Sequence, residues 1–142
     1  MRIKRLAIDD YEAITTLWER AQLPFRPRGR DSKEAILKEI HANPDFFLGV
    51  FDRDRLVAVA ILSCDMRKGW INRLAVDPEY RLQGIAKALI AKSEKIFRSK
   101  GIKLFSALID TDNEASRELF KKCGYTEQHG IAYFSKRDSQ EI

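Results

Sequence analysis

The sequence predicts one α/β domain, of the α+β class, built around a single central sheet. The chain has 142 residues, of which 44% are hydrophobic and 33% are charged, so it can bury an ordinary core. Short runs of β-branched residues alternate along it with longer stretches in which apolar residues recur at helical spacing. No internal repeat, linker or low-complexity segment interrupts this pattern. We therefore expect one domain over 1–142, with a frayed tail at 136–142.

The predicted order of elements is βααβββαβαββ. Its first half comprises a strand at 3–8, helices at 11–22 and between Asp31 and Asn43, and strands at 46–51, 56–63 and 70–76. Asp9 or Asp10 is expected to cap the first helix. Asp31 and Glu34 have the spacing of a capping box at the start of the second. The polar turn 52–55 between two apolar runs indicates a hairpin.

The second half of the chain ends in a small helix and a hairpin. It comprises a helix at 85–99, a strand at 103–109, a helix at 113–122 and closing strands at 125–129 and 131–135. Lys100 and Gly101 favour a helix end, because lysine complements the negative pole of the helix dipole and glycine adopts left-handed backbone angles. Gly124 ends the next helix in the same way, and Gly130 supplies the hairpin turn.

Composition excludes several classes of protein. The 26 Lys and Arg residues exceed the 21 Asp and Glu residues, which gives a net charge of +5 that attracts polyanions, but no nucleic-acid recognition motif is present. No apolar run approaches the roughly 20 residues of a membrane span, and the first residues lack a signal-peptide core, so we expect a cytoplasmic protein. Cys64 and Cys123 lack metal-ligand spacing and only two histidines accompany them, so no metal site is expected.

The most informative segment is 76–86, Val-Asp-Pro-Glu-Tyr-Arg-Leu-Gln-Gly-Ile-Ala. An aliphatic run ends at Asp77-Pro78, a short loop carries Arg81, and Gly84 precedes a long helical pattern. A strand, loop and helix in this order present free backbone N–H groups at the positive end of a helix dipole. Glycine at 84 adds no side-chain bulk, so this loop is expected to bind phosphate.

A second segment, 113–125, reads Asn-Glu-Ala-Ser-Arg-Glu-Leu-Phe-Lys-Lys-Cys-Gly-Tyr. The Arg-x-x-Gly-x-Ala loop resembles the acyl-CoA pyrophosphate loop of the GNAT superfamily of N-acetyltransferases. The second segment resembles the family's Asn-x-x-Ala-x-x-Leu-Tyr-x-x-x-Gly-Phe motif, with Ser116, Phe120 and Tyr125 in place of Ala, Tyr and Phe. The resemblance covers nearly all of the chain. It implies a single-domain GNAT-like fold, with a mixed and mostly antiparallel twisted sheet flanked by helices, and acetyl-CoA as the co-substrate.

The resemblance also implies where CoA binds. In the family, backbone N–H groups of the loop hold the pyrophosphate, and the pantetheine arm enters between the strands that correspond here to 71–76 and 103–109. The residues assigned to CoA in this way are Leu74, Ala75, Val76, Arg81, Leu82, Gln83, Gly84, Ile85, Ala86, Lys87 and Asn113. The N–H near Leu74 would face the thioester oxygen, where negative charge develops. Asn113 is equally well explained as a helix N-cap, and Lys87 as a solvated lysine.

The catalytic acid and base are less well defined. Phe120 stands where family members often carry a tyrosine that protonates the departing thiolate, and Leu108 and Trp70 stand where some members carry glutamate. Asp110 is our first candidate for the general base, because it lies on the same strand face as Leu108 if the strand continues that far. Asp110 also fits the turn before the next helix. Asp65 is the second candidate, and a relayed water would need neither.

The acceptor amine, by the same resemblance, would lie beside the first two helices and the final hairpin. The residues expected to line that site are Arg26, Arg28, Trp70 and Tyr133, with Trp18 and Phe25 as further candidates that fit a core equally well. Three arginines in the loop 25–30 would favour acidic acceptors, unless that loop is simply solvated.

Two functions from different classes remain open. The first is an N-acetyltransferase that moves an acetyl group from acetyl-CoA to a primary amine by direct attack. The acceptor would be a small amine, a peptide N-terminus or a protein lysine, and the missing acid and base favour an α-amine, because its pKa of about 8 is below the ~10.4 of lysine. The alternative is a non-catalytic acyl-CoA-binding or regulatory module of the same fold. Monomer and homodimer, and acyl chains other than acetyl, are all compatible with the sequence.

Overall fold

The computed structural model describes residues 1–142 and has the predicted fold class. Its strands are β1 (Arg2–Arg5), β2 (Phe47–Asp52), β3 (Arg55–Cys64), β4 (Gly69–Val76) and β5 (Phe105–Ser106). Its α-helices are α1 (Tyr11–Arg20), α2 (Lys33–Ala42), α3 (Ile85–Ser99) and α4 (Glu114–Lys122). Short 3₁₀ segments at Ile8–Asp10, Pro44–Phe46 and Pro78–Tyr80 precede α1, β2 and the loop that leads to α3. None of these helices combines the length and the hydropathy needed to cross a bilayer.

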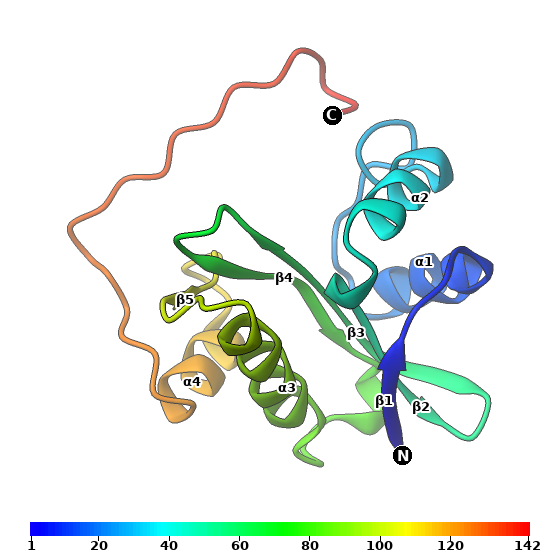
Figure 1. The fold of residues 1–142 in the computed structure, drawn as a ribbon, viewed down its shortest axis with the longest axis horizontal. Helices are drawn as coiled ribbons and strands as arrows, with labels where there is room; N and C mark the ends of the chain where they lie inside the picture. Colours follow the sequence, from blue (N-terminus) through cyan, green and yellow to red (C-terminus); the bar gives the residue numbers. More distant parts are fainter.

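The five strands form one mixed sheet in the order β1-β2-β3-β4-β5. The first three pairings are antiparallel, and β4 and β5 are parallel. Helices α1 and α2 lie on one side of the sheet and α3 on the other, with α4 beside α3 (Figure 1). The mixed, mostly antiparallel sheet flanked by helices is therefore confirmed.

The core lies on both faces of the central strand β3. Residues 56–62 of this strand are all buried, because helices cover both sides of the sheet at this point. The largest side chains that fill the two layers are Trp18 from α1, Phe47 from β2 and Phe97 from α3, each at most 1% exposed. The long hydrophobic run that the sequence shows here thus reflects two-sided burial, whereas the helices show only one apolar stripe.

The start of α2 differs from the expected capping box. Ser32 is the N-cap, and its hydroxyl accepts a hydrogen bond from the N–H of Ala35 at 3.1 Å. Asp31 lies one residue earlier and is buried at 4% exposure, where its carboxylate accepts the N–H of Arg26 at 2.7 Å. The capping box assigned to Asp31 and Glu34 is therefore wrong, because the buried carboxylate is used for a tertiary contact.

The closing hairpin is not formed, and β5 is shorter than expected. Strand assignment stops at Ser106, and residues 126–138 neither donate nor accept any backbone–backbone hydrogen bond. Figure 1 shows this segment leaving α4 and running away from the sheet as an extended chain. A two-stranded hairpin without a surface to pack on is marginal in water, which accounts for the difference from the predicted strands at 125–129 and 131–135.

Candidate functional site

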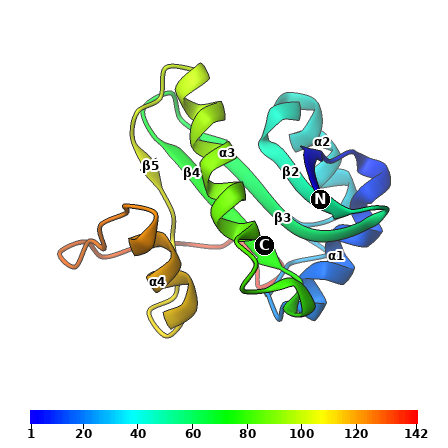
Figure 2. The same ribbon diagram turned by 90° about the horizontal axis from the view of Figure 1, so that it is seen from below.

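Strands β4 and β5 are paired only where they begin. The parallel pairs are Gly69 with Phe105 and Trp70 with Ser106, and β5 ends there. Residues 71–76 of β4 therefore have no strand partner on this side, and the two chains diverge (Figure 2). The divergence lies where the family resemblance implied an entry for an extended ligand.

A β-bulge in β4 borders this divergence. The pairing advances by two residues on β3, from Val59 to Ile61, while β4 advances by three, which makes room for Arg73 and Leu74. Arg73 has a φ of 52°, an angle that costs a non-glycine residue roughly 1–2 kcal/mol. A bulge changes the direction of the backbone and side chains of a strand. Leu74 lies within the bulge, so its backbone groups point differently from those of the regularly paired residues on either side.

The loop from β4 to α3 has a run of backbone donors without protein acceptors. No N–H group from Leu82 to Lys87 donates to another part of the chain. Leu82 and Gly84 have φ values of 62° and 78°, and such alternation turns successive N–H groups toward a common point. A Cβ built on Gly84 meets nothing within 4 Å, so the approach to this point is open.

The charge around this helix end favours an anion. The first turn of α3 contains no acidic residue, and Lys87 is exposed there. The first turns of α1, α2 and α4 contain Glu12, Glu34 and Glu114. The N-terminus of a helix is the positive end of its dipole, so a glutamate in the first turn complements that charge in α1, α2 and α4. In α3 no acidic side chain of the chain complements it.

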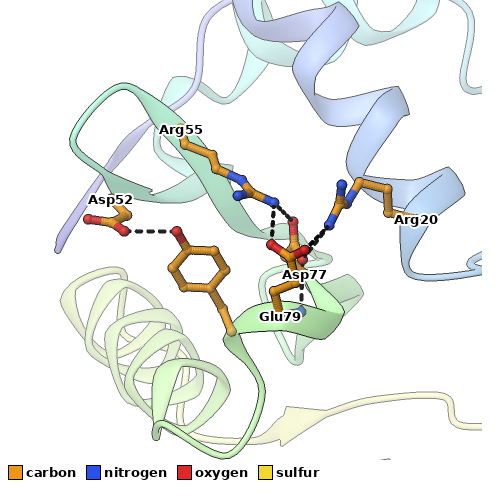
Figure 3. Close-up of polar contacts among 6 residues, drawn as sticks. Arg20, Asp52, Arg55, Asp77 and Glu79 are labelled. Carbon is orange, nitrogen blue, oxygen red and sulfur yellow. Dashed lines mark hydrogen bonds and ion pairs between the residues drawn. The ribbon is translucent and has the colours of Figure 1, made fainter.

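A buried carboxylate anchors the start of this loop. Asp77 is 1% exposed, and its two oxygens accept hydrogen bonds from Arg20 at 3.1 Å and Arg55 at 2.9 Å (Figure 3). The N–H of Glu79 donates to the same carboxylate at 2.9 Å. Burial alone raises the pKa of Asp77, but the Glu79 N–H and the two guanidinium groups outweigh it and hold that pKa below its ordinary value.

The far side of the loop is anchored as well. The Tyr80 hydroxyl donates to Asp52 at 2.8 Å, and the Arg55 guanidinium lies 5.2 Å from the centre of the Tyr80 ring. Arg55 also pairs with the exposed Glu79 at 3.1 Å (Figure 3). The sequence indicated only that an aliphatic run ends at Asp77. In the structure, Asp77 and Glu79 join the loop to Arg20 of α1 and to Arg55 of the β2–β3 hairpin.

A second ion pair joins the β4 bulge to the loop that precedes α2. The Arg73 guanidinium contacts the Asp31 carboxylate, donates to the Pro24 carbonyl at 2.5 Å and lies 4.7 Å from the centre of the Trp18 ring. Burial lowers the pKa of Arg73 from its very high ordinary value. Sequence reasoning missed this pair, because residues 42 positions apart carry no local signal of contact.

The candidate bases occupy turns. Asp110 is exposed, and its carbonyl accepts the N–H of Asn113 at 2.9 Å. The strand face that was to carry Asp110 does not extend that far, because β5 ends at Ser106. Asp65 accepts the N–H groups of Lys68 and Arg67 at 2.8 and 2.9 Å, and these bonds hold its pKa below the ordinary value. Asp65 therefore remains ionised but is engaged with its own turn.

The two aromatic residues of the second motif pack against each other. Phe120 is 5% exposed and meets Tyr125 edge to face, with ring centres 5.0 Å apart. The Tyr125 hydroxyl donates to Glu94 on α3 at 2.9 Å. Burial first, and then this carboxylate, raise the pKa of Tyr125, so its proton is held tightly. Both residues thus fasten α4 to α3.

Asn113 is the N-cap of α4. Its side-chain oxygen accepts the N–H of Ser116 at 3.2 Å. Arg117, in the same helix, donates two bonds to Glu127 at 2.9 and 3.0 Å and is therefore committed to an ion pair. The cap role inferred from the sequence accounts for this geometry.

The residues expected around the acceptor amine are not gathered in one place. Arg26 is half-buried beside the Asp31–Arg73 pair, and Trp70 lies at the start of β4. Arg28 is exposed and lies 3.6 Å from Glu141 near the end of the chain. Tyr133 is 71% exposed in the extended C-terminal segment. Trp18 is completely buried, so it belongs to the core.

No cluster of three or more His, Cys, Asp or Glu side chains that could hold a metal ion occurs in the structure. The candidate site consists of the β4 bulge, the β4–β5 divergence and the open N-terminus of α3. These three features all lie within residues 69–87.

Known proteins resemble this chain in sequence and in fold. The model of the acetyltransferase (GNAT) family matches residues 11–125. An acetyltransferase of Photorhabdus laumondii is 34% identical over 138 residues, which cover 96% of this chain and 95% of the relative. An acetyltransferase of Sodalis glossinidius is 32% identical over 137 residues, with the same coverage of both chains.

The solved structure of the PaiA N-acetyltransferase of Thermoplasma acidophilum, in complex with coenzyme A, superposes with a TM-score of 0.80. The two chains are 25% identical, and 92% of each is covered. Family model, relatives and structure agree over nearly the whole length of the protein. The chain is an acetyltransferase and belongs to the GNAT family.

Proposed function

We propose that this enzyme transfers an acetyl group from acetyl-CoA to a primary amine by direct attack. The observation that carries the proposal is the run of six N–H groups, Leu82 to Lys87, which lack protein acceptors at an uncapped and acid-free helix N-terminus. A pyrophosphate matches such a site, because its oxygens accept several backbone bonds at once and its charge complements the helix dipole. The coenzyme A bound to the matched Thermoplasma protein supports the same ligand.

The rest of CoA would follow the chain away from this helix end. Arg81 and Lys87 are both exposed and would add charge-assisted contacts to the phosphates. The pantetheine arm would run between the diverging strands and bond to backbone groups of Leu74, Ala75 and Val76. Asn113 would contact CoA from the other side in addition to capping α4. Use of acetyl-CoA, an intracellular metabolite, favours a cytoplasmic location.

The bulge would place the reacting carbonyl. In the proposed reaction, the neutral amine nitrogen forms a bond to the thioester carbon, and the carbonyl oxygen gains the negative charge. A backbone N–H at Leu74 would stabilise that oxygen. Collapse of the intermediate breaks the C–S bond and releases CoA as a thiolate, while the amine nitrogen loses a proton. The products are an N-acetylated amine and CoA.

The proton would leave through Asp110 or through water. Asp110 is exposed just beyond the divergence of β4 and β5, so it can exchange protons with solvent. A thiol with a pKa of about 8.5 is a fair leaving group, so the reaction does not depend on a tyrosine acid at the position of Phe120. An acceptor amine of low pKa suits this arrangement, because less of it is protonated at neutral pH.

Release of free thiol from acetyl-CoA in the presence of a panel of amines and peptides tests the proposal. The panel should include small amines, peptides with free N-termini and lysine-containing peptides with blocked N-termini. We expect thiol release that depends on the amine, with the α-amines ahead. Binding of CoA without turnover on any acceptor would favour the alternative of a non-catalytic acyl-CoA-binding module.

A further inference from the structure

Arg73 has a backbone conformation that is unusual for a residue inside a strand. Five residues other than glycine have a positive φ. Four of them lie in turns or loops, namely Gln22, Arg53, Met66 and Leu82. Arg73 is the fifth, and it lies within β4 at the bulge, where a left-handed residue is ordinarily glycine. Such an angle persists in arginine only where surrounding contacts hold it.

The side chain of Arg73 supplies contacts of this kind. Its guanidinium pairs with the Asp31 carboxylate and donates to the Pro24 carbonyl at 2.5 Å. It also lies 4.7 Å from the centre of the Trp18 ring, and the side chain is only 20% exposed. These partners belong to α1 and to the loop before α2, so one side chain ties the bulge to the helices that cover this face of the sheet.

Asp31 is a fixed point of attachment for that side chain. Its carboxylate also accepts the N–H of Arg26 at 2.7 Å, and its own N–H donates to the Arg26 carbonyl at 3.0 Å. Its carbonyl accepts the Tyr11 hydroxyl at 2.7 Å. A carboxylate held from several directions cannot follow Arg73 if the bulge relaxes. The ion pair therefore opposes any change in the backbone angles of Arg73.

The backbone of Arg73 sets the direction of the Leu74 N–H. That N–H belongs to the planar peptide unit that joins residues 73 and 74, so rotation about ψ of Arg73 turns it directly. A donor that stabilises an oxyanion has to point at the place where the negative charge develops. Relaxation of Arg73 toward ordinary strand angles would turn the Leu74 N–H away from that place.

We propose that Arg73 is a positioning residue for acetyl transfer. Its anchored side chain keeps the bulge in the one conformation that directs the Leu74 N–H at the thioester oxygen. Arg73 itself touches neither CoA nor the amine in this role, which rests on the proposed function. The Arg73–Asp31 pair thus connects the loop on the acceptor side to the carbonyl that reacts.

Arg73→Ala and Arg73→Gly separate the backbone angle from the side chain. Both variants lose the anchor, but only alanine is strained at a φ of 52°. With saturating acetyl-CoA and the fastest acceptor of the amine panel, kcat of Arg73→Ala should fall roughly tenfold to a hundredfold, since loss of a whole oxyanion donor costs about 10²–10³ in kcat. Arg73→Gly should turn over at least about threefold faster than Arg73→Ala, and both should keep the native KM for acetyl-CoA.

Arg53→Ala and Arg53→Gly are the matched control pair. Arg53 has a φ of 57° but is exposed in the β2–β3 turn, so the same backbone change there should leave kcat unchanged. A native kcat in Arg73→Ala would overturn the positioning role. Equal kcat values in Arg73→Ala and Arg73→Gly, or a loss that appears only in KM, would overturn it as well.

The amide resonance of Leu74 reports the same geometry without an acceptor. The probe is a ketone analogue of acetyl-CoA in which a methylene group replaces the sulfur, compared with CoA, which has no acetyl carbonyl. We expect only the analogue to move the Leu74 amide proton downfield in the native protein. Arg73→Ala should lose this shift, whereas Arg73→Gly should recover part of it. Asp31→Asn, which weakens the anchor but leaves residue 73 unchanged, should lose it too.

The two measurements distinguish failure of this role from failure of the proposed function. An equal shift in the native protein and in Arg73→Ala would overturn the role, and so would a bound analogue that leaves the native Leu74 resonance unmoved. A native shift that is lost in Arg73→Ala, together with no turnover on any amine, would support the role of Arg73 in directing the N–H and would refute only the acetylation of amines.

Discussion

The N-termini of α3 and α4 are built in opposite ways, although each lies in one of the two family motifs. Helix α4 is closed by its own chain, since Asn113 accepts the N–H of Ser116 and Glu114 lies in the first turn. The N-cap residue of helix α3 is Gly84, which has no side chain to accept a capping bond, and the first turn of the helix has no acid. The open end of α3 is the one that we propose binds a ligand.

The largest expected effect comes from closing the open end with charge. Gly84→Glu places bulk and a carboxylate against the free N–H groups, so CoA affinity should fall at least ~100-fold, or about 2.7 kcal/mol. The measurement is the rise in melting temperature with increasing CoA, which follows mass action on the folded state.

Gly101→Glu is the matched control for this change. Gly101 lies just beyond the C-terminus of α3, has a φ of 80° and also faces open space. Both substitutions therefore carry a similar backbone cost of about 1 kcal/mol, which lowers stability without CoA. Only the variant at Gly84 should lose the CoA response. Equal CoA responses in the two variants would contradict the assignment of the ligand to this helix end.

The next largest effect is expected at Asp77, which anchors the loop that leads to the N-terminus of α3. Asp77→Asn removes the charge that holds Arg20 and Arg55, so the free energy of unfolding should fall by about 2 kcal/mol at pH 7, and the loop should hold CoA less well. The native pKa of Asp77 lies below its unfolded value, so its stabilisation is present above about pH 4 and is lost as the pH falls through the native pKa.

Urea unfolding of both proteins between pH 7 and pH 3 checks this linkage. The difference in stability between native protein and Asp77→Asn should be full near pH 7 and should shrink below about pH 4. Asp52→Asn is a useful comparison, because it leaves the buried carboxylate intact and affects only the bond from Tyr80. A stability difference that is the same at both ends of the pH range would show that the charge of Asp77 does not stabilise the loop.

The sequence predicts the helix α3 and its loop well, but it predicts poorly the features that depend on contacts between distant residues. The boundaries of α3, residues 85–99, agree with the prediction from the amphipathic pattern and from the glycines that flank it, Gly84 and Gly101. Both of these signals are local in the sequence. The free N–H groups follow from the same local order of strand, loop and helix. The buried Asp77 and the Arg73–Asp31 pair were missed, because their partners are far away in the chain and a charged residue ordinarily indicates surface. The closing strands, in turn, need a packing surface that their local pattern does not specify.

A smaller effect tests whether the closed end of α4 also contacts CoA. Asn113→Ala removes the cap and should lower the free energy of unfolding by about 1 kcal/mol. Ser32→Ala removes the equivalent cap of α2 and should cost about the same. If Asn113 binds CoA, only its variant will show a weaker CoA response as well. Indistinguishable CoA responses would leave Asn113 with the cap alone.

The smallest expected effect lies at the acceptor side, in the loop 25–30. We expect Arg26→Ala/Arg28→Ala to raise the KM for acidic amine acceptors by about threefold, or some 0.6 kcal/mol, and to leave neutral acceptors unchanged. The effect is small because Arg28 is largely exposed and already pairs with Glu141, so solvent and a neighbour both compete with the acceptor. It should weaken further as salt is added, since exposed charges are screened over about 8–10 Å at moderate ionic strength. Arg53→Ala/Arg67→Ala, in the β2–β3 and β3–β4 turns, is the matched control, because it also removes two exposed positive charges. Steady-state kinetics on paired acidic and neutral amines decide the question, and an equal change for both classes would remove the loop from substrate selection.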